Sequence, residues 1–483
     1  MKTVTREAST HNATSKTVIY IRFNWISHDK KLVSKAQELA ELYRNEKQPK
    51  RRNRRPFEDA FNVILTSLEV LGGYSHWGIR IPTDHNLYYK TTQRDATYTS
   101  EVLDSLKWLV ASDYLQKVDG MRVIARTVKM LPFAYAITDK WSSRISPSPL
   151  SEPSLIRRNP LASYIQLRNK FDDVTRVVPW PDPVAPDVQS MADETTATLR
   201  CYDEMMRGVT ITLGGQDLNS GQTSLTRIFS RGSFTQGGRL YAPIQNLKSK
   251  VRPYLYFNGE PTVEFDFSSI HPNFLYQIEG LEFDGKDPYS LAGFERGEIK
   301  KAFNIMLNRS PSEAGSSAWK ALVDHLSITK DQAENIEEAI KKLHYPIAHH
   351  FNTGKGLELQ RRDSDVALSV IDYFVRKKRP IIPIHDSFIV SVRDTEDLTI
   401  IMTECYRAVM NEDYWSEDIH TMRGGKCVYN TEYSEDLQDA ILKAIRQNTD
   451  DMGTNYWNRL ISNEPIHHLQ MEESIVDEDL EEP

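Results

Sequence analysis

The sequence predicts an α+β fold in which a small N-terminal module precedes a larger C-terminal core. Apolar residues recur at helical spacing in two segments of the first 130 residues, and strand-like runs follow them. Eight of the 23 prolines lie between Ile145 and Asp187, a stretch that separates the two parts. In the second half, residues 262–267 alternate between polar and apolar as in a strand, and a helical pattern lies at 293–308.

Composition fits a globular protein of more than one domain. The chain has 483 residues, of which 39% are apolar and 26% are charged, and at ~150 residues per domain it should hold two or three domains. No apolar run approaches the ~18 residues that a membrane span needs. The first 16 residues contain no apolar segment of a secretory signal. We therefore expect no membrane partner.

The three cysteines, Cys201, Cys405 and Cys427, are far apart in the sequence. They are too few for a four-cysteine zinc site, and their odd number argues against a disulfide framework. A reducing compartment, the cytoplasm, is the expected location.

Charge is distributed unevenly along the chain. The net charge of −7 argues against a generally basic nucleic-acid binder, but the segment Ile466–Pro483 carries seven acids and neither Lys nor Arg. Five bases lie close together at 50–55. The acidic tail is most simply a solvated, disordered segment, whereas the basic run is either solvated surface or an arm that contacts phosphates.

The N-terminal module should begin with a strand at 18–23 and continue with helices. Apolar residues at helical spacing predict one helix at 57–71 and a second from about Thr99. Strand-like runs at 114–118 and 121–128 flank an Asp-Gly pair, which is typical of a hairpin turn. Helices followed by a two-stranded wing resemble a winged helix-turn-helix, a common DNA-binding module. The alternative is a small α+β packing domain.

The proline-rich stretch predicts an extended linker, because proline at this density continues neither a helix nor a central strand. A helical pattern returns from about Met191 to Arg207.

Asp266 ends the alternating run TVEFD, in which Val263 and Phe265 point to one face and Glu264 and Asp266 to the other. A carboxylate at the end of a strand can hold a metal ion rigidly. Taken alone, Asp266 is better explained as an ordinary strand-end aspartate.

His385 and Asp386 lie between two apolar runs in RPIIPIHDSFIVSV, which predicts two strands joined by a tight turn. Aspartates from two strands can share two divalent ions ~3.5–4 Å apart, an arrangement suited to phosphoryl transfer. Mg²⁺ prefers oxygen ligands and retains waters, so two carboxylates and substrate phosphates suffice.

The helical segment at 293–308 carries Arg296, Lys300 and Asn304 at successive spacings of four residues. On a helix they form a polar stripe whose cations could bind a triphosphate. The simpler interpretation is a surface helix with a charged face.

The order of these segments is their most specific feature, because each motif alone is short. DFSSIHP, the helix at 293–308 and IHDSF resemble motifs A, B and C of the polymerase I-type, family A DNA polymerases and their relatives, the phage-type single-subunit RNA polymerases. GRLYAPIQNL resembles the stretch that precedes motif A, and LQRRDSD resembles the family's Gln-x4-Asp helix start. The resemblance covers roughly residues 225–410. Outside the three motifs it matches Gly238, Arg239, Leu240, Gln245, Asn246, Leu247, Arg252, Gln360 and Asp365.

The resemblance implies a right-hand polymerase core with an antiparallel palm sheet and helical fingers and thumb. Asp266 and Asp386 would then be catalytic residues that hold two Mg²⁺ ions, with Mn²⁺ as an alternative, and His385 would lie near the growing 3′ end. The residues implied to contact nucleic acid are Arg239, Gln245, Asn246, Arg252 and Gln360.

Motif B implies a lysine that binds the incoming triphosphate, and two alignments are open. Pairing Arg296 with Lys300 preserves the family's Arg-x3-Lys but places Asn304 where an aromatic residue stacks on the incoming base. Pairing Lys301 preserves a Lys-Ala-x-Asn string but puts Gly297 where the arginine belongs. We prefer the first alignment, because two phosphate-binding cations outweigh one asparagine.

His271 follows the motif A aspartate by five residues, where a bulky side chain in family A DNA polymerases blocks the ribose 2′-hydroxyl. The RNA-polymerase relatives carry glycine there, so an imidazole favours deoxynucleotides. The alternative is that His271 only caps the helix that starts near Pro272.

Three features depart from the family. Ser387 replaces the glutamate that usually follows the motif C aspartate, as in the single-subunit RNA polymerases. Motifs A and C are only 120 residues apart, which implies reduced fingers. No acidic exonuclease pattern is visible in the N-terminal half, so we expect no proofreading.

The sequence thus predicts a DNA polymerase that acts on primer-template DNA with nucleoside triphosphates, of a kind suited to a phage, plasmid or other mobile genetic element. One alternative is an RNA polymerase or primase-like enzyme, and another is an inactive scaffold that binds DNA in replication or regulation. The expected parts are an arm at 1–55, a winged-helix-like module at 56–135, a linker at 136–187, a core at 188–450 and a tail at 451–483.

Overall fold

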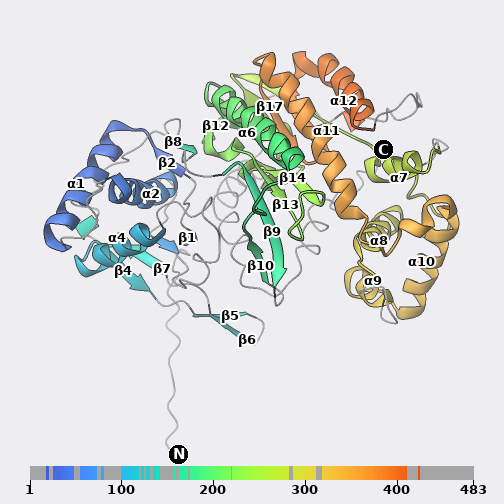
Figure 1. The fold of residues 1–483 in the computed structure, drawn as a ribbon, viewed down its shortest axis with the longest axis horizontal. Coiled ribbons are helices and arrows are strands. Elements are labelled where there is room, and N and C mark those ends of the chain that lie inside the picture. Colours follow the sequence, from blue (N-terminus) through green and yellow to red (C-terminus); the bar gives the residue numbers. More distant parts are fainter. Residues whose placement is uncertain are drawn as a thin grey trace, which may run out of the picture. The chain divides into compact units, whose positions relative to one another are not determined.

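The computed structural model describes residues 18–20, 25–47, 55–72, 78–80, 99–118, 121–124, 127–130, 134–138, 140–141, 156–158, 163–171, 174–218, 220–281, 287–311, 318–410 and 423–424. These residues fall into two compact units, one with elements β1 through β8 and the other with β9 through β19. Both units combine helices with mainly antiparallel sheets, so the α+β class predicted from the sequence is confirmed (Figure 1).

Helices of the N-terminal unit pack around an aromatic core. The helices are α1 (Lys30–Lys47), α2 (Arg55–Gly72) and α4 (Thr99–Ala111). The Trp108 ring of α4 meets Tyr43 of α1 and Phe61 of α2 edge-on, at centroid distances of 5.9 and 5.7 Å. Its indole Nε1 donates to Glu46 Oε2 at 2.8 Å. The segment expected to be a basic arm therefore contains a helix that contributes to a core.

Strands of this unit differ from the expected wing. They are β1 (Val18–Tyr20), β2 (Trp25–Ser27), β3 (Gly78–Arg80), β4 (Leu115–Val118), β5 (Met121–Ile124), β6 (Thr127–Met130), β7 (Ala134–Ile137) and β8 (Ile156–Arg158). The run 121–128 is not one strand paired with β4, because β5 pairs with β6 and β4 pairs with β7 in the sheet β1-β3-β7-β4. Leu115 and Tyr135 are both buried, so the β4–β7 pair contributes to the core of the unit.

A four-stranded sheet opens the second unit, where the sequence predicted a linker. Its strands are β9 (Ile165–Phe171), β10 (Val174–Val177), β13 (Thr226–Phe229) and β14 (Gly237–Tyr241), in the order β10-β9-β13-β14. β9 runs parallel to β13, and buried Ile165 and Leu167 join a core with Phe229 and Phe234. The expected linker thus contributes structure to the core.

An antiparallel seven-stranded sheet forms the centre of the second unit. Its strands are β11 (Ile211–Leu213), β12 (Gln216–Asp217), β15 (Leu255–Phe257), β16 (Glu260–Asp266), β17 (Ile381–Ile384), β18 (Ser387–Ser391) and β19 (Arg423–Gly424). The order is β12-β11-β15-β16-β18-β17, and β19 pairs with β16. Every residue of β17 and β18 is buried, in agreement with their apolar sequences.

The helices of this unit are α6 (Pro186–Arg207), α7 (Ile270–Ile278), α8 (Arg296–Asn308), α9 (Ala318–Leu326), α10 (Lys330–Leu343), α11 (Gly356–Arg376) and α12 (Thr395–Met410). The 3-10 helices are η2 (Ser220–Thr223), η3 (Pro243–Asn246), η4 (Arg252–Tyr254), η5 (Tyr345–His350) and η6 (Val392–Asp394). The long α11 contacts β14, α6, α7, α8 and α12, so it links most parts of this unit (Figure 1). α8, α9 and α10 pack against one another as a separate helical group. None of the helices in the described ranges is long and apolar enough to cross a membrane.

Candidate active site

Asp266 and Asp386 lie at the same end of two adjacent strands. Asp266 is the last residue of β16, and its Cα partner in the antiparallel ladder is Ser387, the first residue of β18. The amide of Phe267 donates to the carbonyl of Asp386 at 3.3 Å. Both aspartate side chains are half-buried. Two aspartates that are 120 positions apart in the sequence therefore lie close together at the same end of two paired strands.

A tight turn presents His385 and Asp386. These two residues form the loop between β17 and β18, since Ile384 and Ser387 are the last paired residues. His385 has a φ of 59°, a left-handed conformation for which glycine is the usual residue in two-residue hairpin loops. Its ring lies edge-on to that of Tyr241, with centroids 5.5 Å apart. The histidine is thus held in a conformation that costs backbone energy.

The loop after Asp266 has a similar feature. Ser269 precedes α7 with a φ of 54°. The turn places His271 in the first turn of α7, where it is half-buried. His271 Nε2 is 3.0 Å from Asp363 Oδ2, so α7 is joined to α11 by this pair. The imidazole therefore has a partner on another helix, whereas the sequence left open only a role in capping α7.

Arg239, His271 and Asp363 form a buried ionic network. The Arg239 guanidinium donates from Nε and Nη2 to Asp363 Oδ2, at 3.1 and 2.5 Å. Burial acts to raise the pKa of Asp363, but Arg239 and His271 outweigh it and lower that pKa below its usual range. Asp363 is therefore a stable anion although only 1% of its side chain is exposed.

The Arg239 guanidinium also interacts with one of the candidate carboxylates, that of Asp386. Burial opposes the charged form of Arg239, yet Asp363 and, to a smaller extent, Asp386 raise the pKa of its guanidinium. The charge on Arg239 is thus shared between a buried anion on α11 and the aspartate at the tip of the hairpin.

Tyr289 interacts electrostatically with Asp386 and with Arg296 at the start of α8. Burial raises the pKa of its phenol, Arg296 lowers it, and Asp386 raises it further. The Arg296 guanidinium lies 5.5 Å from the centre of the Tyr289 ring and pairs with Asp287. The pKa of the Tyr289 phenol therefore depends on both Asp386 and Arg296.

Three polar side chains of α8 are partly exposed. Lys300, Lys301 and Asn304 are all half-buried, whereas Phe303 and Leu307 are fully buried. Among the described residues, Lys300 and Lys301 have no carboxylate oxygen within 4 Å, so neither charge is neutralised by an ion pair there. Both lysines of the two motif alignments remain candidates on this geometry.

Glu264, Ser387 and Arg252 form a second polar group beside Asp266. Arg252 Nε and Nη2 bind the two carboxylate oxygens of Glu264 at 2.7 and 2.9 Å, and Ser387 Oγ donates to Glu264 Oε1 at 2.6 Å. Ser387, the departure from the family pattern, thus fixes a carboxylate two residues before Asp266. Arg252, expected to contact nucleic acid, is engaged by this pair.

The other residues expected to contact nucleic acid occupy different positions. Gln245 joins β14 to the hairpin, since its Nε2 donates to the carbonyls of Leu240 and Pro383 at 3.0 and 2.9 Å. Asn246 is half-buried at the end of η3, and Gln360 is buried in the first part of α11. Gln245 therefore binds backbone carbonyls of the protein itself, and Gln360 is buried, so neither side chain is simply a surface group.

Sequence reasoning missed two residues of this region, Arg227 and Asp363. Arg227 on β13 is fully buried and donates to Gly238 O, Thr195 Oγ1, Ser364 Oγ and Asp365 Oδ1. Burial lowers its pKa to about 10. Asp363 lies in the matched LQRRDSD segment, but its role depends on Arg239, which is 124 positions away. A local pattern gives no signal for such a pair.

Several sequence expectations lie outside the described residues. They concern most of the basic run at 50–55, the acidic tail and Cys427. Of the other cysteines, Cys201 is exposed and Cys405 is buried, and burial raises the pKa of the Cys405 thiol to about 12.

No protein-family model matches the chain, and a comparison with curated proteins finds no significant match. The interpretation of the site therefore depends on its own geometry and chemistry.

Proposed function

We propose that the protein is a template-directed nucleotidyltransferase, and specifically a DNA-directed DNA polymerase without proofreading exonuclease. The observation that carries the proposal is the position of Asp266 and Asp386 at the same end of two paired strands of an antiparallel sheet. The order of the motifs along the chain supports it.

The donor set of these two aspartates suits Mg²⁺. Asp266 and Asp386 offer carboxylate oxygens from half-buried positions, the ligands that Mg²⁺ prefers. When bound, two such ions lower the pKa of an attacking 3′-hydroxyl and stabilise the negative charge on a leaving pyrophosphate. The positive charge of Arg239 interacts with Asp386.

The chain's cations support binding of a nucleoside triphosphate. Arg296 at the start of α8 interacts with Tyr289, whose pKa also responds to Asp386. Lys300 lies one helical turn further along the same helix, on the face shared with Arg296. In the proposed reaction these cations orient the triphosphate, while Asp266 and Asp386 hold the reacting groups.

Product type and the role of the N-terminal unit are parts of this proposal. His271 favours DNA as the product, whereas Ser387 favours the alternative of an RNA polymerase or primase-like enzyme. The N-terminal unit, with its helices and short strands, would bind duplex DNA. The third possibility, an inactive scaffold, requires that the aspartate pair has no catalytic role.

One experiment tests the proposal directly. The purified protein is incubated with a primer-template, Mg²⁺ and either dNTPs or NTPs, and extension is measured for wild type, Asp266→Asn and Asp386→Asn. Each substitution should reduce incorporation by several orders of magnitude with little change in DNA affinity, because the charge that would hold the ions is lost. Asp324→Asn, an exposed aspartate on α9, is the matched control. Near-normal extension by both variants would refute the site, and preferential use of NTPs would favour the RNA-polymerase alternative.

A further inference from the structure

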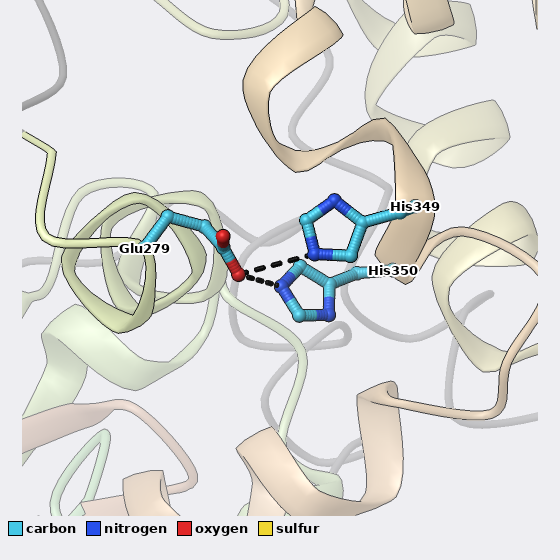
Figure 2. Close-up of side chains that lie close together, drawn as sticks. All are labelled: Glu279, His349 and His350. Atoms are coloured by element: carbon cyan, nitrogen blue, oxygen red, sulfur yellow. Dashed lines mark hydrogen bonds and ion pairs between the residues drawn. The ribbon is translucent and has the colours of Figure 1, made fainter.

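A second group of candidate metal ligands lies away from the aspartate pair. Glu279 follows α7 directly, and His349 and His350 end η5. Figure 2 shows both imidazoles directed at the carboxylate of Glu279, and one ligand atom from each residue lies within 4.8 Å of the others. We propose that these three side chains form a binding site for a single Zn²⁺ ion that joins the end of α7 to η5.

The distances are close to those of a zinc site. His349 Nε2 and His350 Nε2 lie 3.1 and 2.7 Å from Glu279 Oε1. Zn–N and Zn–O bonds of about 2.0–2.2 Å place neighbouring ligands of a tetrahedral ion about 3.3 Å apart. The first distance fits this spacing, and the second needs an opening of about half an ångström, within reach of side-chain rotation.

The chemistry of the donor set selects the metal. Two imidazoles and one carboxylate are a set that zinc uses, whereas Mg²⁺ prefers oxygen ligands alone. These three donors therefore favour zinc over Mg²⁺.

Binding changes the tautomers of the imidazole rings. In the metal-free arrangement each Nε2 carries a hydrogen that it donates to the carboxylate. Zn²⁺ needs the lone pair on Nε2, so in each neutral ring the hydrogen moves to Nδ1 and the two hydrogen bonds are replaced by metal bonds.

Access and location are consistent with an ion that links two segments of the chain. The side chains of His349 and Glu279 are 58% and 29% exposed, so an ion can reach them from solvent, and the fourth position is open to water. α7 and η5 are in contact, and Glu279 is 70 positions from His349. An ion here would hold the helix that carries His271 against the segment that leads into α11.

The test is metal binding by the full-length chain, measured by titration with Zn²⁺ and by the absorption spectrum with Co²⁺, in excess Mg²⁺ so that carboxylate-only sites are filled. Wild type should bind one ion at this site with a tetrahedral Co²⁺ spectrum, and Zn²⁺ should raise its Tm. His349→Ala and Glu279→Gln should each weaken binding at least about tenfold and abolish the Tm increase.

Matched controls separate this site from other histidines and thiols. The double variant His467→Ala/His468→Ala removes the other adjacent histidine pair of the sequence, and His28→Ala removes an exposed single histidine; both should bind as wild type does. A thiolate-to-cobalt charge-transfer band would assign the ion to cysteine and overturn the proposal. Equal affinity in wild type and His349→Ala, or loss of binding only in the 467/468 variant, would overturn it as well.

Discussion

Nη2 of Arg239 on β14 lies 2.5 Å from Oδ2 of Asp363 on α11, although the two residues are 124 positions apart. This ion pair joins the four-stranded sheet to α11, the helix that links most parts of the unit, and His271 adds α7 to it. Because the pair is buried, neither partner can be removed without leaving an uncompensated charge.

Asp363→Asn should destabilise the protein by about 3–5 kcal/mol at pH 7, the usual effect of removing one member of a buried ion pair. The lowered pKa of Asp363 also makes stability depend on pH. Its contribution is complete above the unfolded value of about 3.9 and is lost as the pH falls through the lower folded value. Urea unfolding at several pH values below 5 should therefore show a smaller decline in the variant than in wild type. Coincident unfolding curves at pH 7 would contradict the assignment.

Lys300 and Lys301 allow the two alignments of α8 to be distinguished. Lys300→Ala should raise the KM for the nucleotide by about tenfold or more, since hydrogen bonds to charged groups contribute about 1.5–3 kcal/mol. Lys301→Ala, the neighbouring control, should have a smaller effect. Steady-state primer extension measures both. The opposite order would favour the Lys301 alignment, and equal small effects would exclude α8 from nucleotide binding.

His271→Gly tests the choice of sugar. If the imidazole occupies the space of a ribose 2′-hydroxyl, the ratio of kcat/KM for a dNTP and its matching NTP should fall substantially. His271→Gln retains bulk and should preserve most of the ratio. Both variants lose the imidazole contact with Asp363, so thermal unfolding of each must be measured alongside. An unchanged ratio with reduced Tm in both would make His271 purely structural.

Gly356 at the start of α11 lies close to the side chain of Asn308, which leaves little room for a Cβ. A Cβ at this position would lie 2.1 Å from Asn308 Oδ1 at the end of α8. Gly356→Ala should therefore cost about 1–3 kcal/mol in the free energy of unfolding. Asn308→Ala should relieve much of that cost in the double variant.

Gly297 in α8 is the control for this prediction, since no atom lies within 4 Å of a Cβ built there. Gly297→Ala should be neutral or stabilising by up to about 1 kcal/mol, because alanine is the better helix former. Equal effects of alanine at the two glycines would show that the contact with Asn308 relaxes freely.

The boundary of the second unit is testable with fragments. A fragment that starts at Pro160 should fold, whereas one that starts at Asp187 lacks β9 and loses Ile165 and Leu167 from the core. Each buried side chain of this size contributes about 1.5–3 kcal/mol, so the shorter fragment should unfold several kcal/mol more easily in urea. Equal stability of the two fragments would exclude β9 from the core.

Local patterns predicted the elements that carry the candidate site. The alternation before Asp266 gave β16, and the apolar runs around His385 gave the hairpin of β17 and β18. The helix expected at 293–308 begins at Arg296, three residues later. Each of these segments is specified by residues close together in sequence, where periodicity is informative.

Pairings between distant segments were not predictable in the same way. Prolines counted over 145–187 suggested a linker, although residues 161–178 contain none and include β9 and β10. β9 pairs in parallel with β13, which comes about 60 residues later. The partnership of Arg239 with Asp363 likewise depends on how α11 crosses β14. Single-sequence periodicity contains no information on either arrangement.

The distance in sequence between Arg239 and Asp363 has a consequence for synthesis on the ribosome. At 5–20 residues per second, roughly 6–25 s pass between translation of the arginine and of its carboxylate. The interval between translation of Arg227 and of its partner Asp365 is about as long. Throughout that interval the guanidinium groups of Arg227 and Arg239 lack their native partners Asp365 and Asp363. Chains released before α11 is made should consequently fail to fold and be degraded, so the core is completed late in translation.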